Sequence, residues 1–246
     1  MISVESRCAC ELGKVRENNE DAIAFDDDSG YWIVADGMGG HVYGEVASQM
    51  AVEITAKSLS EGKTSKQAIL AAHKAILERA ETENDKFGMG TTIVVLTQSK
   101  KCFDVTWCGD SRAYLYDGAI TQLTYDHTLV QDMVFREILT EEEAAVHPKR
   151  NLVNSSLGMI KGNLRIDVEN IAPTNDGYLL LCSDGVSDYV LQPALQQIFQ
   201  ENSTLDKIDE AIRSAVLTTE AADNFSYIIV RFGVNMTASL LNRLFK

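Results

Sequence analysis

Hydrophobic positions alternate with polar ones in some stretches of the chain and recur every three to four residues in others. Alternation over a short stretch is typical of a half-buried strand, and the longer recurrence is typical of an amphipathic helix. Alternating or continuously apolar stretches predict strands at residues 2–12, 21–25, 31–35, 91–98, 102–109, 112–116, 119–123, 164–171, 177–184 and 225–233. Helical spacing predicts helices at residues 44–59, 65–86, 127–146, 193–200 and 205–219, with a short amphipathic helix at 237–246.

The order of these elements favours antiparallel sheets, because most successive strands are joined by short turns. The Asp117-Gly118 pair is a strong hairpin signal between two of them. The acidic turn at residues 26–30 lacks the longer ligand spacing of a calcium loop, so we expect it to close a second hairpin. The two long consecutive helices need an apolar surface to cover. We therefore expect an α+β fold in which two sheets pack face to face and the helices lie outside.

Composition is consistent with one domain spanning residues 1–246. The chain has 45% hydrophobic residues, which is enough for a core, and its three prolines and lack of a Gly/Ser-rich linker mark no boundary. Its 36 Asp and Glu residues against 22 Lys and Arg residues give a net charge of −14. Such a surface repels nucleic-acid phosphates and anionic lipid, and either attracts cations and basic segments or simply keeps the protein in solution.

Targeting signals are not evident in the sequence. No stretch reaches the roughly 18 apolar residues that a membrane helix needs, and charged residues come too early for a signal peptide. We therefore expect a cytoplasmic protein that binds neither membrane nor nucleic acid, and we expect a monomer. The five cysteines are Cys8, Cys10, Cys102, Cys108 and Cys182. Without a CxxC pair they favour small core residues over a zinc site.

Four aspartates lie next to predicted strands. Asp36 and Asp184 end apolar stretches, Asp110 follows one after a glycine, and Asp223 precedes one. Burial and mutual repulsion would raise the pKa of carboxylates gathered at strand ends. A divalent cation bound among them would offset both the cost of burying the charges and the repulsion between them. Their hard oxygen ligands favour Mg²⁺ or Mn²⁺.

Glycines follow Asp36 in the stretch "VADGMGGHV". They either allow the backbone to approach a metal or substrate closely, with the Gly37 carbonyl as a ligand, or form a plain turn. A nucleotide-binding loop fits poorly, because the third glycine of GxGxxG is absent. Asp-Gly pairs are common in turns, so each aspartate alone is weak evidence and only the set is persuasive.

Eight motifs occur in the order and spacing of a known family. They are "GKVRENNEDA" (13–22), "VADGMGGHVYGEVAS" (34–48), "GMGTT" (88–92), "CGDSRAYL" (108–115), "LTYDHT" (123–128), "HPKRN" (147–151), "SDGVSD" (183–188) and "DNFS" (223–226). With these motifs the chain resembles the bacterial metal-dependent serine/threonine protein phosphatases of the PPM, or type 2C, family over nearly its whole length. The family fold is a four-layer α-β-β-α sandwich, which agrees with the elements above.

The resemblance implies two core metal ions, Mn²⁺ or Mg²⁺. It makes Asp36 the bridging ligand and a catalytic residue, Asp184 and Asp223 the remaining protein ligands of one ion, and the Gly37 carbonyl a ligand of the other. Glu20 and Asp21 match residues that hold metal-bound waters. Bacterial members often bind a third ion, whose ligands match Asp110 and Asp184.

The resemblance also assigns a catalytic role to Arg16, which matches the arginine that grips the substrate phosphate; a planar guanidinium suits two phosphate oxygens. A metal-activated water then attacks phosphorus in line, without a phosphoenzyme. Many eukaryotic members have a histidine, the proposed general acid, where this chain has Met38. His41 lies three residues further on, and nothing in the sequence indicates that it acts as the general acid.

The remaining histidines and the segment 128–156 are interpreted through their context. His127 is expected to be a hydrogen-bonded residue near the site, His73 a helix residue and His147 a loop residue. Residues 128–156 match the family's flap, which either docks substrates or partners or is a solvated cap.

The favoured function is therefore a phosphatase that acts on phosphoserine and phosphothreonine in proteins and opposes a bacterial Ser/Thr kinase. A phosphatase-like binding or regulatory module is the alternative, although Asp36, Asp184 and Asp223 are all retained. A target-restricted regulator of the sigma-factor partner-switching type usually lacks parts of the arginine motif that this chain keeps. A small-molecule phosphohydrolase remains open until peptides and metabolites are compared as substrates.

Overall fold

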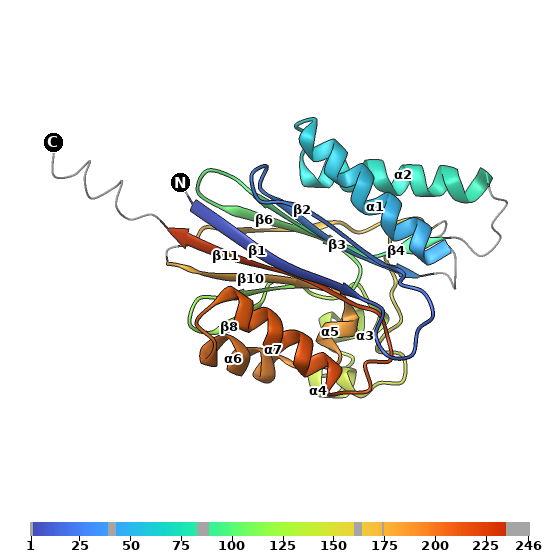
Figure 1. Ribbon diagram of the computed structural model, residues 1–246. Coiled ribbons are helices and arrows are strands. Elements are labelled where there is room, and N and C mark those ends of the chain that lie inside the picture. The colour runs from blue at the N-terminus through green and yellow to red at the C-terminus, as the bar shows by residue number, and fades with distance from the viewer. Residues whose placement is uncertain (1, 39–42, 83–88, 160–163, 174, 235–246) are drawn as a thin grey trace.

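Two antiparallel sheets form the centre of the molecule, with helices on both outer faces (Figure 1). The computed structural model describes residues 2–38, 43–82, 89–159, 164–173 and 175–234. The expected α+β sandwich of four layers is confirmed. The expected helix at 237–246 lies outside the described residues.

The first sheet has five strands in the order β1-β11-β10-β7-β8. The second runs in the order β2-β3-β5-β6-β9, with the short β4 also paired to β3. The strands of the first sheet are β1 (Ile2–Glu11), β7 (Arg112–Tyr116), β8 (Ile120–Gln122), β10 (Gly177–Cys182) and β11 (Phe225–Val234). Those of the second are β2 (Asp21–Asp26), β3 (Tyr31–Met38), β4 (Gly90–Thr91), β5 (Ile93–Gln98), β6 (Phe103–Cys108) and β9 (Asp167–Ile171).

Strand β10 illustrates how the apolar sequence is divided between two cores. Leu179 and Leu181 pack between the two sheets, whereas Leu180 and Cys182 face the helices on the outside. All four side chains are fully buried. Because side chains alternate along a strand, a continuous apolar run is what a strand covered on both faces requires.

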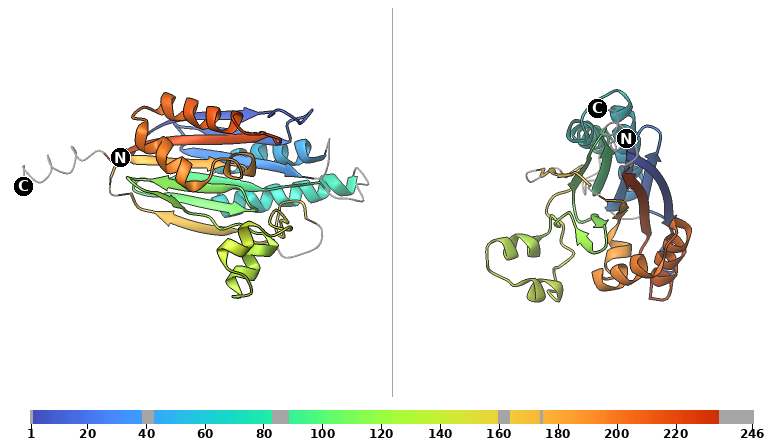
Figure 2. Two further views of the ribbon diagram at one scale, coloured as in Figure 1. Left: turned by 90° about the horizontal axis from the view of Figure 1, so that it is seen from below. Right: turned by 90° about the vertical axis from the view of Figure 1, so that its left-hand side faces the viewer.

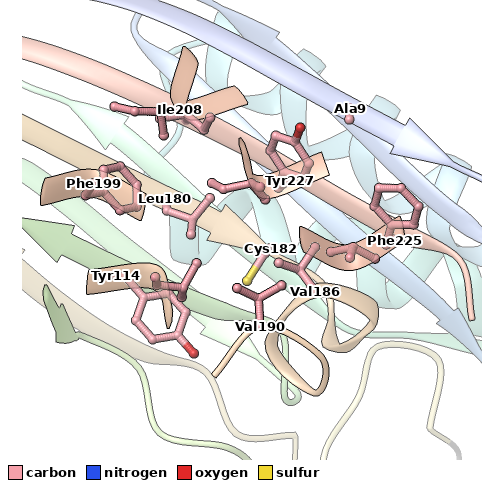
Figure 3. Close-up of a cluster of buried hydrophobic side chains, with 14 of the residues drawn as sticks. Ala9, Tyr114, Leu180, Cys182, Val186, Val190, Phe199, Ile208, Phe225 and Tyr227 are labelled. Atoms are coloured by element: carbon pink, nitrogen blue, oxygen red, sulfur yellow. The ribbon is translucent and has the colours of Figure 1, made fainter. Parts of the chain in front are cut away.

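Helices α6 (Gln192–Glu201) and α7 (Leu205–Leu217) cover the outer face of the first sheet. Figure 3 shows Phe199 and Ile208 of these helices packed over Leu180 and Tyr227 of the strands. Helix α7 begins after Thr204, whose side chain accepts a hydrogen bond from the Lys207 amide.

Helices α1 (Tyr43–Ser60) and α2 (Ser65–Thr82) cover the second sheet. Their buried faces are rich in alanine, which lets the helices lie close to the strands and to each other; these alanines are Ala47, Ala51, Ala68, Ala72 and Ala80. The expected helix at 65–86 is confirmed as far as Thr82, and residues 83–88 lie outside the described part.

The acidic segment 127–146 is not one helix, contrary to its sequence pattern. It forms α3 (Leu129–Phe135) and α4 (Glu141–Ala145), which begin after Thr128 and Thr140 as capping residues. Between them Glu137 has a φ of 58°, a left-handed conformation that ends a helix. Two capping threonines within one acidic stretch favour two short helices over one long helix.

Other boundaries differ from the sequence prediction near the aspartates. Strand β3 continues through Asp36 to Met38 because Gly37 and Met38 pair with β4. Strand β10 ends at Cys182, and Asp184 is the first residue of the short helix α5 (Asp184–Ser187). Strand β9 begins only at Asp167.

Helices α3 and α4 project from the side of the sandwich (Figure 2, right). They lie within residues 128–156, the segment that the family resemblance assigns to a flap. No helix among the described residues is long and apolar enough to cross a membrane.

Candidate functional site

Figure 1 shows the end of the sandwich where β1 ends and β11 begins. A cleft of about 730 Å³, lined largely by charged and polar residues, lies there. Segments far apart in the sequence meet there: the loop after β1, the end of β3, the turn after β6, the start of α5 and the loop before β11. The expected site residues that line it are Arg16, Glu20, Asp36, Gly37, Asp110, Asp184 and Asp223.

Asp21 and Asp36 lie directly opposite each other in the β2–β3 pair. Asp21 is buried and accepts a hydrogen bond of 2.9 Å from the Ser183 hydroxyl. Burial raises the pKa of Asp21 to about 7. Burial, together with the neighbouring carboxylates of Asp21 and Asp184, raises the pKa of Asp36 well above its ordinary value.

Asp110 and Asp184 bring two more carboxylates to the same cleft. Asp110 follows the Gly109 turn after β6, and burial followed by the charge of Asp184 raises its pKa well above the ordinary value. Burial also raises the pKa of Asp184 to about 6, with the charges of Asp188 and Asp223 acting in the same direction. These carboxylates lack enough positive charge nearby to offset their burial.

The donor set fits a hard divalent cation, since carboxylate and carbonyl oxygens are the ligands that Mg²⁺ and Mn²⁺ prefer. Within the residues that the structure describes, no three His, Cys, Asp or Glu side chains are arranged to hold an ion by themselves. Mg²⁺ commonly keeps several waters among its ligands, so a few carboxylate and carbonyl oxygens in one cleft are a suitable donor set.

Gly37 is a strand residue, so the plain-turn interpretation of this glycine is wrong. Its amide donates a 3.0 Å hydrogen bond to the Glu20 carbonyl. A Cβ atom at this position would lie 2.3 Å from the Gly44 carbonyl oxygen and 2.4 Å from that of Glu20. Glycine is needed because α1 begins directly against β3. Gly39 and Gly40 lie outside the described residues.

The loop that carries Arg16 is fastened to the loop that carries Asp223. An Arg16 guanidinium nitrogen lies 2.7 Å from an Asp223 carboxylate oxygen, and about half of the Arg16 side chain is exposed. The Lys14 amide donates to the Ala221 carbonyl at 2.8 Å. The Lys14 ammonium donates to the carbonyls of Leu217 and Thr219 at the end of α7.

A family model described as protein phosphatase 2C matches residues 14–220, which is most of the chain. The chain belongs to the protein phosphatase 2C family. Two relatives are the serine/threonine phosphatase stp of Listeria monocytogenes, 31% identical over 89% of this chain and 92% of the relative, and the serine/threonine protein phosphatase PstP of Mycobacterium tuberculosis, 34% identical over 89% of this chain and 43% of the relative.

Solved structures of protein phosphatase 2C relatives have the same fold. The M. tuberculosis phosphatase PstP/Ppp superposes with a TM-score of 0.82 at 30% identity, covering 94% of this chain and 99% of that one. A PstP catalytic domain in complex with two manganese ions gives 0.81 at 28% identity, covering 95% and 100%. The resemblance found in the sequence is thus confirmed, and the chain is a metal-dependent serine/threonine protein phosphatase.

Asn224 organises this protein phosphatase 2C cleft, a role that the sequence analysis missed. Its side-chain amide donates to the carbonyls of Leu12 and Asn18, at 2.9 and 3.0 Å, and its side-chain oxygen accepts from the Glu20 amide at 2.9 Å. One asparagine thereby joins three points of the loop around Arg16. Its position in "DNFS" was the available signal, because asparagine often hydrogen-bonds to loop backbone.

The histidines agree with their sequence interpretation where the structure describes them. His127 is buried and hydrogen-bonded, with its Nε2 atom 3.0 Å from an Asp167 carboxylate oxygen. His73 is a half-buried residue of α2 and His147 lies in the loop after α4. His41 lies outside the described residues.

The cysteines are only partly core residues. Cys108 and Cys182 are fully buried, and burial raises the pKa of each thiol to about 12. Cys8 and Cys102 are partly buried, whereas Cys10 is exposed and its Sγ atom lies 3.3 Å from the Asn19 side-chain nitrogen. The prediction of small core residues is therefore wrong for Cys10, which lies close to the end of β1 where the sheet meets the loop.

Proposed function

We propose that the chain hydrolyses phosphoserine and phosphothreonine in proteins with the help of two divalent cations, Mn²⁺ or Mg²⁺, in the carboxylate-lined cleft. The observation that carries the proposal is the gathering of Asp36, Asp110 and Asp184, whose pKa values are raised, in one cleft beside Arg16. Bound there, divalent cations would offset the charges of carboxylates and phosphate and lower the pKa of an attacking water.

The aspartates and one glycine carbonyl are the proposed protein ligands. Asp36 is assigned to both cations, Asp184 and Asp223 to one of them, and the Gly37 carbonyl to the other. In support, all four residues line the same cleft. Asp36 comes from β3 and Asp184 from the start of α5, so rigid elements position these two carboxylates.

Further acidic residues are proposed to support this centre. Glu20 and Asp21 would orient water by accepting hydrogen bonds from it, and Asp21 itself accepts a hydrogen bond from the Ser183 hydroxyl. Asp110 with Asp184 is the proposed ligand pair of a third cation. In support, Asp110 is buried and its pKa is raised by burial and by the charge of Asp184.

Arg16 is the proposed phosphate-binding residue. Its guanidinium is about half exposed at the edge of the cleft and pairs with Asp223. A phosphate group entering the cleft would accept two hydrogen bonds from the planar guanidinium, and this would hold phosphorus above the carboxylates. The same contact would stabilise negative charge on the equatorial oxygens as the bond to the leaving oxygen breaks.

The proposed partners are phosphorylated proteins, including a Ser/Thr kinase and its targets. The acidic surface supports protein substrates over nucleic acid. We further propose that the chain acts as a cytoplasmic monomer, with residues 1–246 as a single phosphatase domain.

The proposal is tested by hydrolysis of a phosphothreonine peptide with EDTA, Mg²⁺ or Mn²⁺ present. Activity should appear only with an added cation. Asp36→Asn should reduce kcat at least about a hundredfold, because the variant keeps the shape of the side chain and loses its charge. Asp28→Asn is the matched control, since Asp28 is exposed in the β2–β3 turn.

Near-normal turnover by a folded Asp36→Asn variant would contradict the metal assignment. A folded wild-type chain that binds the phosphopeptide and hydrolyses none of it, with either cation, would instead support the binding-module alternative.

A further inference from the structure

His127 lies in the segment that joins β8 to α3, and its side chain is fully buried. The Gly109 amide donates to its Nδ1 atom at 3.1 Å, and the His127 amide donates back to the Gly109 carbonyl at 2.9 Å. Because a backbone amide can only donate, Nδ1 carries no proton. The proton of the neutral ring therefore lies on Nε2, which faces the Asp167 carboxylate at 3.0 Å.

The Gly109 turn that His127 holds is the one that carries Asp110. Gly109 has a φ of +111°, and a Cβ atom there would lie 2.6 Å from the Thr92 side chain. The Thr92 hydroxyl in turn accepts from the Asp36 amide at 3.2 Å and contacts the Ser111 hydroxyl at 2.6 Å. The turn is thus fitted between the strand of Asp36 on one side and His127 on the other.

His127 also joins the two ends of the flap segment 128–156. Its carbonyl accepts from the Asn154 amide at 2.9 Å, and the next residue, Thr128, forms a bridge with Val153. One residue therefore contacts the turn before Asp110 with its ring and the returning end of the flap with its backbone.

Asp167 fixes the orientation of the ring. Its carboxylate accepts from the Tyr125 hydroxyl at 2.6 Å and from Arg165 Nε at 2.7 Å. Arg165 also reaches the Asp132 carboxylate of α3 at 3.4 Å. With Asp167 held by these donors, the Nε2 proton has a fixed acceptor, which keeps Nδ1 free to accept from Gly109.

Asp110 lies on the wall shared by two cavities. The first is the cleft described above, and the second, of about 390 Å³, lies between α5 and the flap helices α3 and α4. Asp110, Asn151 and Asp184 line both. His127 lines neither cavity and both of its ring nitrogens are engaged, so its ring is not placed to exchange a proton with substrate.

We propose that His127 is a positioning residue. Its Nδ1 atom holds the Gly109–Asp110 turn at a fixed position relative to the two ends of the flap segment 128–156, and this fixes Asp110 between the two cavities. The effect on turnover rests on the function proposed above. The hydrogen-bond assignment does not, and it can be measured on its own.

The assignment is tested first on the wild-type protein with Mg²⁺ present. Long-range ¹H–¹⁵N NMR correlations distinguish a ring protonated on Nε2 from one protonated on Nδ1. The Nε2–H form is expected for His127. A ring protonated on Nδ1 would overturn the proposal, whether or not the protein proves to be a phosphatase.

Two variants separate the contacts of the ring. In His127→Asn the side-chain oxygen takes the place of Nδ1 and keeps an acceptor for Gly109. In His127→Gln the amide nitrogen takes the place of Nε2 and keeps the donor to Asp167. Hydrogen exchange of the Gly109 amide should accelerate about tenfold or more in the Gln variant and stay within about threefold in the Asn variant, since one hydrogen bond is lost only in the former.

The two His127 variants should also differ in kcat while keeping similar KM values. We expect kcat to fall about tenfold in His127→Gln and by less than about threefold in His127→Asn, with KM within about twofold in both. His73 supplies the matched control, because its Nδ1 atom also accepts from a backbone amide, that of Gly158 at 3.1 Å, and it does not line either cavity. His73→Asn and His73→Gln should leave kcat unchanged.

Equal losses of kcat in both His127 variants, with equal Gly109 exchange, would show that the ring only fills space. If either variant does not fold, the NMR tautomer of the wild type still decides the hydrogen-bond assignment.

Discussion

At the residue scale, Lys14 shows how a side chain outside the cleft can affect substrate binding. Its ammonium donates to two carbonyls at the end of α7, and its amide donates to Ala221, two residues before Asp223. The loop that carries Arg16 is thereby attached to the segment that carries Asp223. The position of Arg16 thus depends on a helix end in a different layer of the molecule.

We expect Lys14→Met to raise KM for a phosphopeptide about three- to tenfold with little change in kcat. The aliphatic chain is kept while the ammonium contacts to Leu217 and Thr219 are lost, so the loop of Arg16 is held less firmly. Steady-state kinetics measure the effect, and Lys66→Met on the exposed face of α2 is the control. An unchanged KM would show that Asn224 and the backbone contact to Ala221 hold the loop without the Lys14 ammonium.

At the element scale, α7 is attached to the first sheet by an apolar stripe. Ile208 is fully buried in it and lies over Tyr227 in Figure 3. Ile208→Ala should lower the free energy of unfolding by about 2–5 kcal/mol, because the removed methyl groups leave a cavity under the helix. Urea unfolding measures this loss, and kcat at 25 °C should not change while the protein remains folded.

A substitution at an exposed position of α7 tests whether the loss of unfolding free energy in Ile208→Ala comes from the burial of Ile208. Glu210→Ala on the outer face of α7 should change the free energy of unfolding by less than about 0.5 kcal/mol. Equal losses at residues 208 and 210 would contradict the packing described here.

The elements were largely predictable because their sequence patterns are strong and local. The alternation of hydrophobic and polar residues predicted the strands, and hydrophobic residues at helical spacing predicted α1, α2, α6 and α7. The flap was not predictable in the same way, because its acidic composition favours a helix throughout and only the capping roles of Thr128 and Thr140 divide it. The start of α5 at Asp184 was also missed, since four residues are too few to show a period.

The candidate site was predictable only in part. The aspartates were identifiable only as a set, because four of them lie next to predicted strands. Of the two interpretations given for Gly37, the plain turn was wrong. The clash that requires glycine comes from Gly44 and Glu20 and appears only after α1 packs on β3. The sequence indicated a hydrogen-bonded His127 and an asparagine able to bond to loop backbone, but the partners of Asn224 and His127 lie in distant segments and appear only in the structure.

At the scale of the whole molecule, the excess of acidic residues should influence which peptides reach the cleft. The chain carries 36 Asp and Glu residues against 22 Lys and Arg, and several of the acids line the cleft itself. We expect kcat/KM at low salt to be about tenfold higher for a phosphothreonine peptide flanked by lysines than for one flanked by glutamates. Raising the ionic strength to about 0.5 M should remove most of this difference.

A matched peptide with serine and alanine flanks serves as the reference and should respond least to salt. A preference for glutamate flanks at low salt would mean that the cations bound in the cleft, and not the acidic surface, control the approach of substrate.

The pairing of β1 with β11 also has a consequence for biosynthesis. Residues 2–11 pair with residues 225–234 along their whole length, and the cleft takes Arg16 from just after β1 and Asp223 from just before β11. While a ribosome still holds β11 in its exit tunnel, β1 has no partner strand and the two halves of the cleft stay apart. We therefore expect a nascent chain to be inactive on phosphoproteins until β11 has left the exit tunnel and paired with β1.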